Sequence, residues 1–278
     1  MKRKTAIVTG TSSGFGMLCA VELAKAGFDV VSTMRNLDRA ENLLKLADSH
    51  NVADQIHLHP LDVTSAESVS TFTTYIKKFH SIDVLVNNAG FALGGFSEEL
   101  TADEYRLQFE TNVFGVIAVT QNVLPIMRKN RRGRIINMSS ISGKFGFPGL
   151  SPYTASKHAL EGYSESLRLE LRPFGIDVVL VEPGSYQTNI WSSIDNMTIN
   201  SDSPYHFYME ALLEDIETGK GSHGDPLDVA KLVTRIATSS KTPKLRYTIG
   251  KGVRLSLFLK VILPWKLLEK VILNKLLK

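Results

Sequence analysis

The sequence alternates short runs of β-branched and apolar residues with longer segments in which apolar residues recur every three or four positions. Several of the short runs have no polar residue at alternate positions, as is typical of strands covered by helices on both faces of a sheet. The pattern predicts an α/β fold with three layers and a doubly wound, seven-stranded, mainly parallel sheet. The predicted strands are Thr5 to Thr9, Asp29 to Thr33, Gln55 to His59, Val84 to Asn87, Arg134 to Met138, Asp177 to Glu182 and Arg246 to Ile249.

No internal repeat, low-complexity tract or Pro/Gly-rich linker marks a domain boundary before about residue 250. We therefore expect one domain over residues 1–250, followed by a C-terminal extension over residues 251–278. The segment from Ser185 to Asp225 is aromatic-rich and weakly periodic, which is typical of a substrate lid; the alternative is a helical insertion that packs on the domain. Helices are predicted over Phe15 to Ala26, Ser65 to Phe79, Ala102 to Arg128, Pro152 to Arg172 and Pro226 to Ala237.

Composition excludes several classes of protein. A net charge of +4 over 278 residues gives no reason to expect a nucleic-acid partner. The single cysteine, Cys19, rules out an intrachain disulfide, agrees with a reducing compartment and is expected to be buried in a helix. The first apolar run ends at Gly10 rather than at a cleavage site, and no apolar stretch approaches the roughly 20 residues of a membrane-spanning helix. We expect a cytoplasmic protein.

The first predicted strand leads directly into a glycine-rich turn, TGTSSGFG at residues 9–16, and then into a helix. Glycines let the backbone approach a pyrophosphate closely, and the free N–H groups at the start of a helix attract its charge. The alternative is a purely structural turn, since the spacing is GxxxGxG. The turn predicts dinucleotide contacts at Gly10, Ser12, Ser13, Gly14, Phe15 and Gly16.

The end of the second strand carries Arg35 where NAD-binding proteins place an acidic residue against the ribose 2′-hydroxyl. A guanidinium can bind a 2′-phosphate, so NADP(H) is the preferred cofactor and NAD(H) is the second option. In the alternative interpretation Arg35 is solvated and Asp38 turns toward the ribose. Asp62 and Val63 follow the third strand, where the carboxylate can accept from the adenine amino group or cap the next helix.

A tyrosine and a lysine are separated by four positions in Tyr153-Thr154-Ala155-Ser156-Lys157. This spacing puts both side chains on one face of a helix, where the ammonium can stabilise a phenolate that otherwise forms only near pH 10. Ser140 lies thirteen residues earlier, at the end of a predicted strand, and its hydroxyl can hold a substrate oxygen. Ser139 and Ser142 are the alternatives for that role.

These motifs, with Asn87-Asn88-Ala89-Gly90, Asn112 and Pro183-Gly184, occur in an order that resembles the short-chain dehydrogenase/reductase family, in its hydroxysteroid and retinol dehydrogenase-like branch. The resemblance covers roughly residues 4 to 250 and implies a Rossmann-type fold and an NAD(P)-dependent oxidoreductase acting on a CH–OH group. It implies that Tyr153 donates a proton to a carbonyl oxygen, that Lys157 binds the nicotinamide ribose and lowers the tyrosine pKa, and that Ser140 positions the substrate.

By the same resemblance Asn112 holds a water in a proton relay; the alternative is a residue at a helix kink with no chemical role. Asn88 is expected beside the cofactor, although it could also simply tie strands together. Ser13 stands where many NADP-using relatives have a basic residue, which leaves the cofactor preference resting on Arg35. The resemblance places Asn88, Ala89 and Gly90 beside the adenosine half, Pro183 and Gly184 against the nicotinamide, and Thr188 near its carboxamide or a phosphate.

Hydride transfer of this kind needs no metal, and His57 and His59 have no third ligand nearby in the sequence, so no metal site is expected. The aromatic insertion and the apolar C-terminal extension favour a hydrophobic steroid-, retinoid- or fatty-acyl-like substrate. An alternative from another class is a non-catalytic sensor that binds NADPH. Retention of Ser140, Tyr153 and Lys157 together disfavours this sensor, because a sensor needs only the nucleotide pocket.

The C-terminal extension interrupts apolar runs with lysines, and Pro264 divides it into two short helices. These helices could lie on an anionic membrane surface with Trp265 at the interface, as in a peripheral membrane protein. The alternative is packing against the domain or a second subunit. The family resemblance predicts a homodimer or homotetramer built on the helices Ala102 to Arg128 and Pro152 to Arg172.

Overall fold

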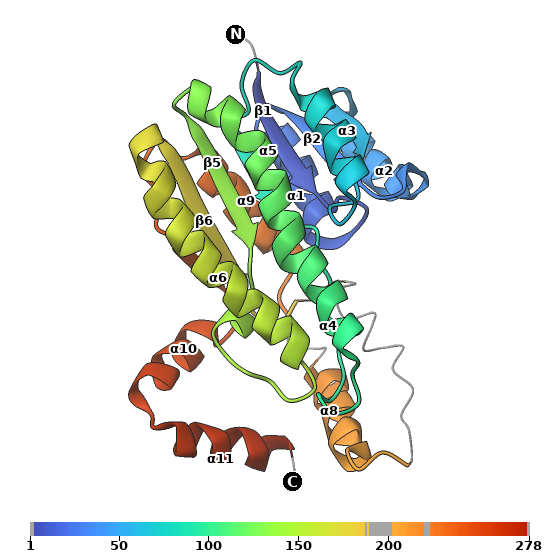
Figure 1. The fold of residues 1–278 in the computed structure, drawn as a ribbon, viewed down its shortest axis with the longest axis vertical. Coiled ribbons are helices and arrows are strands. Elements are labelled where there is room, and N and C mark those ends of the chain that lie inside the picture. Colours follow the sequence, from blue (N-terminus) through green and yellow to red (C-terminus); the bar gives the residue numbers. More distant parts are fainter. Residues whose placement is uncertain (1–2, 187, 189–201, 220–222, 277–278) are drawn as a thin grey trace.

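The computed structural model describes residues 3–186, 188, 202–219 and 223–276 (Figure 1). One seven-stranded sheet runs through it in the order β3-β2-β1-β4-β5-β6-β7, and all neighbouring strands are parallel. The predicted α/β fold is confirmed, and each predicted strand agrees with the structure to within one residue at either end. The strands are β1 (Lys4–Thr9), β2 (Phe28–Met34), β3 (Ile56–Pro60), β4 (Val84–Asn87), β5 (Gly133–Met138), β6 (Ile176–Pro183) and β7 (Arg246–Ile249).

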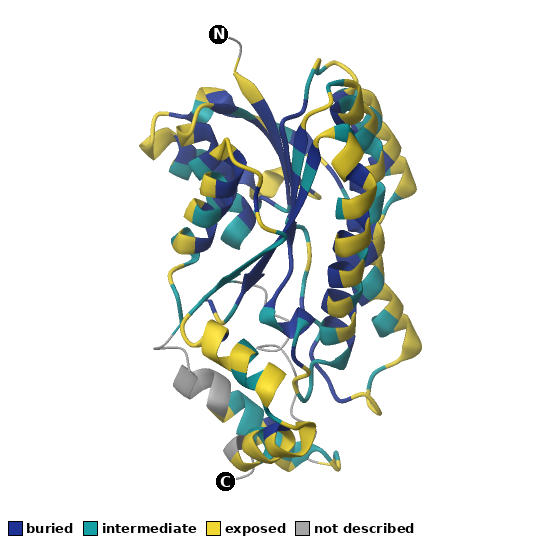
Figure 2. Ribbon diagram, turned by 90° about the vertical axis from the view of Figure 1, so that its left-hand side faces the viewer, coloured by how far each residue is buried: buried dark blue, intermediate teal, exposed yellow. Residues whose placement is uncertain are grey.

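Helices cover both faces of the sheet because alternate strand residues point to opposite sides. Ala6 and Val8 of β1 pack in one apolar cluster with α1 (Gly14–Lys25), α2 (Glu41–Ser49) and α9 (Pro226–Thr238). Ile7, between them, packs in the other cluster with α3 (Ala66–Ile76), α5 (Gly115–Lys129) and α6 (Ser151–Leu171). Buried residues consequently follow the sheet through the centre of the domain (Figure 2).

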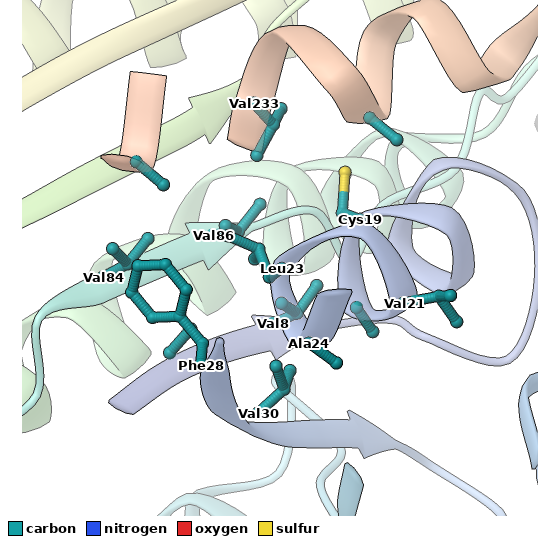
Figure 3. Packing of buried hydrophobic residues seen from close by; sticks show 14 of the residues in the cluster. Val8, Cys19, Val21, Leu23, Ala24, Phe28, Val30, Val84, Val86 and Val233 are labelled. Carbon is teal, nitrogen blue, oxygen red and sulfur yellow. The ribbon is translucent and has the colours of Figure 1, made fainter. Parts of the chain in front are cut away.

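The first of these clusters is built from medium-sized side chains that interlock (Figure 3). Leu23 of α1 lies with Val8 and Phe28 of the sheet, and Val233 of α9 closes the cluster from the other side. Cys19 belongs to this cluster and is fully buried, as expected. Burial raises the pKa of its thiol to about 12, so the group is an inert packing residue at neutral pH.

The long helix predicted over Ala102 to Arg128 is two helices joined by a wider turn. A π-helical turn, Glu110–Phe114, separates α4 (Ala102–Phe109) from α5. A capping box between Thr101 and Glu104 starts α4. Apolar periodicity does not reveal the extra residue of a π turn, which is why the sequence suggested one continuous helix.

Three further helices lie beyond the carboxyl ends of the strands (Figure 1). They are α8 (His206–Gly219), α10 (Val253–Ile262) and α11 (Trp265–Leu276), and Pro264 stands between the last two. Among the described residues, no helix combines the length and the apolar character needed to cross a bilayer. Helix α2 was not predicted from the sequence, whereas α8 lies in the segment Ser185 to Asp225, for which a helical insertion was the alternative interpretation.

Candidate active site

A cavity of about 460 Å³ lies at the carboxyl ends of the strands, where β1 and β4 are neighbours and the chain order reverses. It brings together the turn after β1, the end of β2 and the segments after β3 and β4. Predicted residues that line it are Gly10, Ser12, Ser13, Gly14, Phe15, Arg35, Asp62, Val63, Asn88, Ala89, Gly90 and Thr188. Sequence reasoning missed Met34, Leu61, Thr64, Phe91, Leu107 and Thr111, which carry no motif of their own.

The glycine-rich turn requires glycine for two separate reasons. Gly10 has a φ of +70°, and a Cβ there would lie 2.8 Å from the Cα of Ala89. Gly16 does not line the cavity; a Cβ on Gly16 would lie 2.2 Å from the carbonyl oxygen of Gly10. Gly16 therefore lets α1 pack against the turn. Ser13 precedes α1 without capping it through its side chain, which leaves N–H groups of the first turn available to an anion.

Asn88 joins two of the segments that line the larger cavity. Its side-chain amide donates to the carbonyl oxygens of Thr9 (2.9 Å) and Gly10 (3.0 Å), and its backbone N–H donates to the Thr9 hydroxyl (3.0 Å). Asn88 thus connects the end of β4 to the end of β1, which is the structural role that was given as the alternative for this residue. It also lines the cavity. The two roles of Asn88 are compatible.

The part of the larger cavity beside the ends of β2 and β3 has one cation and one carboxylate among its lining residues. Arg35 is exposed directly after β2 and forms no ion pair within the described part of the chain. Asp38 does not line the cavity, which removes the main support for its alternative role. Asp62 accepts hydrogen bonds at one oxygen from the backbone and hydroxyl of Thr64 (3.0 and 2.8 Å). The helix cap proposed for Asp62 is wrong, because Ser65 caps α3.

A smaller cavity of about 50 Å³ adjoins the first one and shares Phe15, Asn88, Gly90 and Thr188 with it. It lies where β5, β6 and the start of α6 meet. The predicted residues Ser140, Tyr153, Lys157, Pro183 and Gly184 all line it, together with Ser139, which was an alternative to Ser140, and with Met138 and Tyr186, which were not predicted as site residues.

Ser140 and Ser139 both line this cavity, but their hydroxyl groups have different partners. Ser140 forms a hydrogen bond with Tyr153, which partly offsets the effect of burial on the pKa of that phenol. Ser139 donates instead to Glu161 Oε1 at 2.6 Å, and Ser142 is absent from the cavity lining. Of the three serines, only Ser140 pairs with the tyrosine.

Tyr153 and Lys157 lie on one face of α6, and the Lys157 ammonium is 5.6 Å from the centre of the tyrosine ring. Burial raises the pKa of Tyr153 to about 12, and Lys157 is not among the causes of that shift. Burial is thus the largest effect on the phenol. The expected lowering of the tyrosine pKa by Lys157 stays a prediction. Lys157 donates to the carbonyl oxygen of Met138 at 2.7 Å, and burial lowers its own pKa to about 8.

Asn112 lies in the π turn between α4 and α5, 1% exposed. Its side-chain amide donates to the carbonyl oxygen of Phe91 (3.0 Å) and to the Ser156 hydroxyl (3.2 Å), and its oxygen accepts from the Phe91 N–H (3.2 Å). The amide therefore connects the segment after β4 to α6, beside Tyr153. Its part in a proton relay stays a prediction.

Aromatic residues in the described part of the segment Ser185 to Asp225 form two groups of ring contacts, of which that of Tyr186 and Phe15 lies at the smaller cavity. Tyr186 packs edge-on against Phe15, with ring centroids 5.6 Å apart. Tyr205 stacks on Phe96 at 4.5 Å, and Tyr208 meets the same ring at 5.7 Å. Trp191 lies outside the described residues, and Phe207 is exposed.

Behind Lys157 lies a buried carboxyl pair that sequence reasoning missed, Glu161 and Glu182. Glu161 Oε2 accepts from Lys144 Nζ (2.6 Å) and from Arg246 Nε (2.8 Å). Arg246 Nε is also 3.3 Å from Glu182 Oε1. The signal was present, since Glu161 follows Lys157 by one helical turn on the face that carries Tyr153.

This pair predicts a specific dependence of stability on pH. Burial and the neighbouring Glu161 raise the pKa of Glu182 from 4.5 to about 7. The folded state therefore holds more protons than the unfolded state between these values, and the free energy of unfolding falls as pH rises through that window. We expect Glu182→Gln to remove this fall. The free energy of unfolding of the variant minus that of the wild type should therefore increase as the pH rises from 5 to 8.

Urea unfolding at several pH values measures the effect. Glu165→Gln is the control, because the Glu165 side chain is 55% exposed and pairs with the same Arg246. The control should follow the wild-type profile between pH 5 and pH 8. Parallel profiles for Glu182→Gln and the wild type would contradict the assigned shift.

Comparison with known proteins agrees with this geometry. The family model described as short chain dehydrogenase matches residues 4–198. The chain is 51% identical to the uncharacterized oxidoreductase YusZ of Bacillus subtilis (strain 168), over 99% of both chains. It is 38% identical to the 3-ketodihydrosphingosine reductase of Bacteroides thetaiotaomicron, over 91% of this chain and 90% of that one.

Solved structures give the same result. A short-chain dehydrogenase from Streptomyces avermitilis superposes with a TM-score of 0.80 at 33% identity, covering 94% of this chain and 93% of the other. ElxO with NADP bound gives a TM-score of 0.75 at 30% identity, covering 91% and 100%. The fold and site define an oxidoreductase that acts on CH–OH groups. The chain belongs to the short-chain dehydrogenase/reductase family.

Proposed function

We propose that the protein is an NADP(H)-dependent oxidoreductase that reduces a hydrophobic carbonyl compound or oxidises the corresponding secondary alcohol. The observation that carries the cofactor preference is Arg35, which is exposed, lines the larger cavity and has no ion-pair partner among the described residues, at a position where no acidic residue stands. The similarity to ElxO, whose structure holds NADP, supports it. The open N-terminus of α1 and the glycine-rich turn fit the pyrophosphate.

The polar side chains of the smaller cavity have separate roles in the proton transfer. The bound nicotinamide would supply or accept the hydride. Tyr153, with its pKa raised to about 12, keeps its proton at neutral pH and can donate it to the carbonyl oxygen. Ser140, hydrogen-bonded to Tyr153, holds the same oxygen and stabilises the charge that develops there. Lys157, which is buried next to the tyrosine ring and lines the same cavity, can bind the ribose.

The cofactor preference gives a direct test. We expect Arg35→Asp to lower the ratio of NADPH to NADH affinity by roughly 10- to 100-fold, since hydrogen bonds to a charged group contribute about 1.5–3 kcal/mol and the new carboxylate repels a 2′-phosphate. Fluorescence titration of the purified protein with each cofactor measures the ratio. A substrate is not required.

Arg39→Asp is the matched control, because Arg39 is exposed four residues later and does not line the cavity. It makes the same change of charge and should leave the ratio near the wild-type value. If Arg35→Asp and Arg39→Asp behave alike, Arg35 does not select the cofactor.

The hydrophobic substrate is supported by the surroundings of the smaller cavity. Met138 and Tyr186 line it, and Phe96, Tyr205 and Tyr208 form an aromatic cluster near α8. The relative from Bacteroides thetaiotaomicron is named 3-ketodihydrosphingosine reductase, so its name gives a keto compound as its substrate. We expect NADPH consumption with long-chain ketones such as 3-ketodihydrosphingosine to exceed that with short, water-soluble ketones. Equal rates across chain length would refute this choice of substrate class.

A further inference from the structure

The two C-terminal helices expose large apolar side chains to solvent. In α10, Leu255, Phe258 and Ile262 are 62%, 60% and 54% exposed and recur at helical spacing on one face. The opposite face is anchored, because Val253 is 4% exposed. Val261, 85% exposed, extends the outward face. Most solvent-exposed apolar residues in a soluble protein are scattered singly, so a cluster of this kind marks an interaction surface.

Helix α11 continues this surface with a different pattern. Trp265, Leu267 and Val271 are 59%, 50% and 63% exposed. Lys266 and Lys270 are exposed one helical turn apart next to them. Leu268, 9% exposed, is on the inner side, where α11 contacts α8. The outward side thus combines apolar groups with ammonium groups that can reach past them.

The charge of the C-terminal extension indicates which kind of surface it can bind. Residues 251–278 contain seven Lys or Arg residues and one acidic residue, Glu269. Two copies meeting face to face would bring like charges together, which costs free energy. An anionic lipid surface offers the complementary charge and an apolar layer beneath it, and tryptophan is favoured at that boundary.

The surface is fixed to the wall of the smaller cavity. A Cβ on Gly184 would lie 2.5 Å from Val253 Cγ2, so the first turn of α10 packs directly behind a residue of the site. Lys260 Nζ lies 5.1 Å from the centre of the Phe145 ring and holds α10 to the segment after β5. Both helices lie at the end of the molecule beyond the strands, and exposed residues cover much of them (Figures 1 and 2).

We propose that the outward faces of α10 and α11 form a docking surface for the anionic headgroup layer of a lipid bilayer. The apolar side chains Leu255, Phe258 and Ile262 enter the upper acyl region, and Lys266 and Lys270 bind phosphate groups. The binding does not depend on the catalytic reaction.

The test uses the full-length protein and vesicles of phosphatidylcholine with or without phosphatidylglycerol. We expect sedimentation with the phosphatidylglycerol vesicles, little with pure phosphatidylcholine, and weaker binding at high salt. The chain has two tryptophans, so a Trp191→Phe background reports on Trp265 alone. Its emission should shift to the blue on binding.

Variants separate the apolar and the charged parts. Phe258→Glu should weaken vesicle binding by about tenfold or more. Its control is Leu169→Glu on α6, at a position 77% exposed. Lys266→Gln with Lys270→Gln should weaken binding by about fivefold for each lysine. The control pair, Lys77→Gln with Lys129→Gln, removes the same charge at the amino ends of β4 and β5.

Three outcomes would overturn the proposal. They are the absence of binding to both vesicle types, equal effects of the test and control variants, and a dimer of the wild type that Phe258→Glu converts to a monomer. The last result, seen by size-exclusion chromatography with light scattering, would assign the surface to a second copy of the chain.

Discussion

Tyr153→Phe is expected to lower the turnover rate by about a thousandfold, within the range found for removal of a general acid or base. The substitution removes one oxygen atom and leaves a ring that fills the same space. Binding of NADPH should therefore remain within about twofold of the wild type, because the nucleotide contacts lie mainly in the larger cavity. Stopped-flow or steady-state assays with the best substrate of the ketone panel measure turnover, and fluorescence titration measures binding.

Tyr163→Phe is a matched control for this experiment. Tyr163 lies on the same helix, α6, is partly buried and has a hydrogen bond with Thr120, and burial raises the pKa of its phenol to about 12, as it does for Tyr153. The control removes the same atom at a place away from the cavities. Comparable turnover in Tyr153→Phe and Tyr163→Phe would show that the phenol of Tyr153 is not the proton donor.

Gly16→Ala is expected to lower both stability and cofactor affinity. The new Cβ would lie 2.2 Å from the Gly10 carbonyl oxygen and 2.4 Å from the Asn88 side-chain nitrogen. Both neighbours are held by the hydrogen bonds that join β1 and β4, so the helix or the turn must move. We expect the free energy of unfolding to fall by about 2–3 kcal/mol. If the displaced turn makes the free energy of NADPH binding less favourable by about 1.4 kcal/mol, the affinity for NADPH falls tenfold.

The control is Gly146→Ala, because a Cβ on Gly146 meets no atom within 4 Å. Its free energy of unfolding should stay within about 0.5 kcal/mol of the wild type. Urea denaturation and NADPH titration on both variants distinguish a local clash from a general intolerance of alanine. Wild-type stability in Gly16→Ala would mean that α1 does not need to approach the turn so closely.

The sequence was sufficient to predict the sheet, because covered strands and amphipathic helices have different periods. It also identified the larger cavity through residues whose chemistry depends on local spacing, such as Gly10 and Arg35. Residues whose position depends on the tertiary fold were harder to find. Leu107 and Thr111 reach the cavity because α4 and the π turn pass beside it, and nothing in their immediate sequence indicates this.

The sequence pattern also did not predict which effect on the pKa of Tyr153 is the largest. The spacing of Tyr153 and Lys157 suggested that the cation would dominate the phenol, whereas the depth of the site makes desolvation larger. The buried Glu161 was overlooked because acidic residues on helices are usually solvated. Its partners Lys144 and Arg246 come from distant parts of the chain, 17 and 85 residues away.

The direction of the strands also determines how the molecule can be attached to other materials. β1 begins at the end of the sheet away from the cavities, and α11 lies beyond the carboxyl ends of the strands, the end at which the cavity-lining residues are found (Figure 1). A fusion partner or a solid support joined through the amino-terminal end should leave the substrate entrance free. The same attachment through the carboxyl-terminal end would crowd that entrance, so biosensors or immobilised catalysts made from this chain should be tethered by β1.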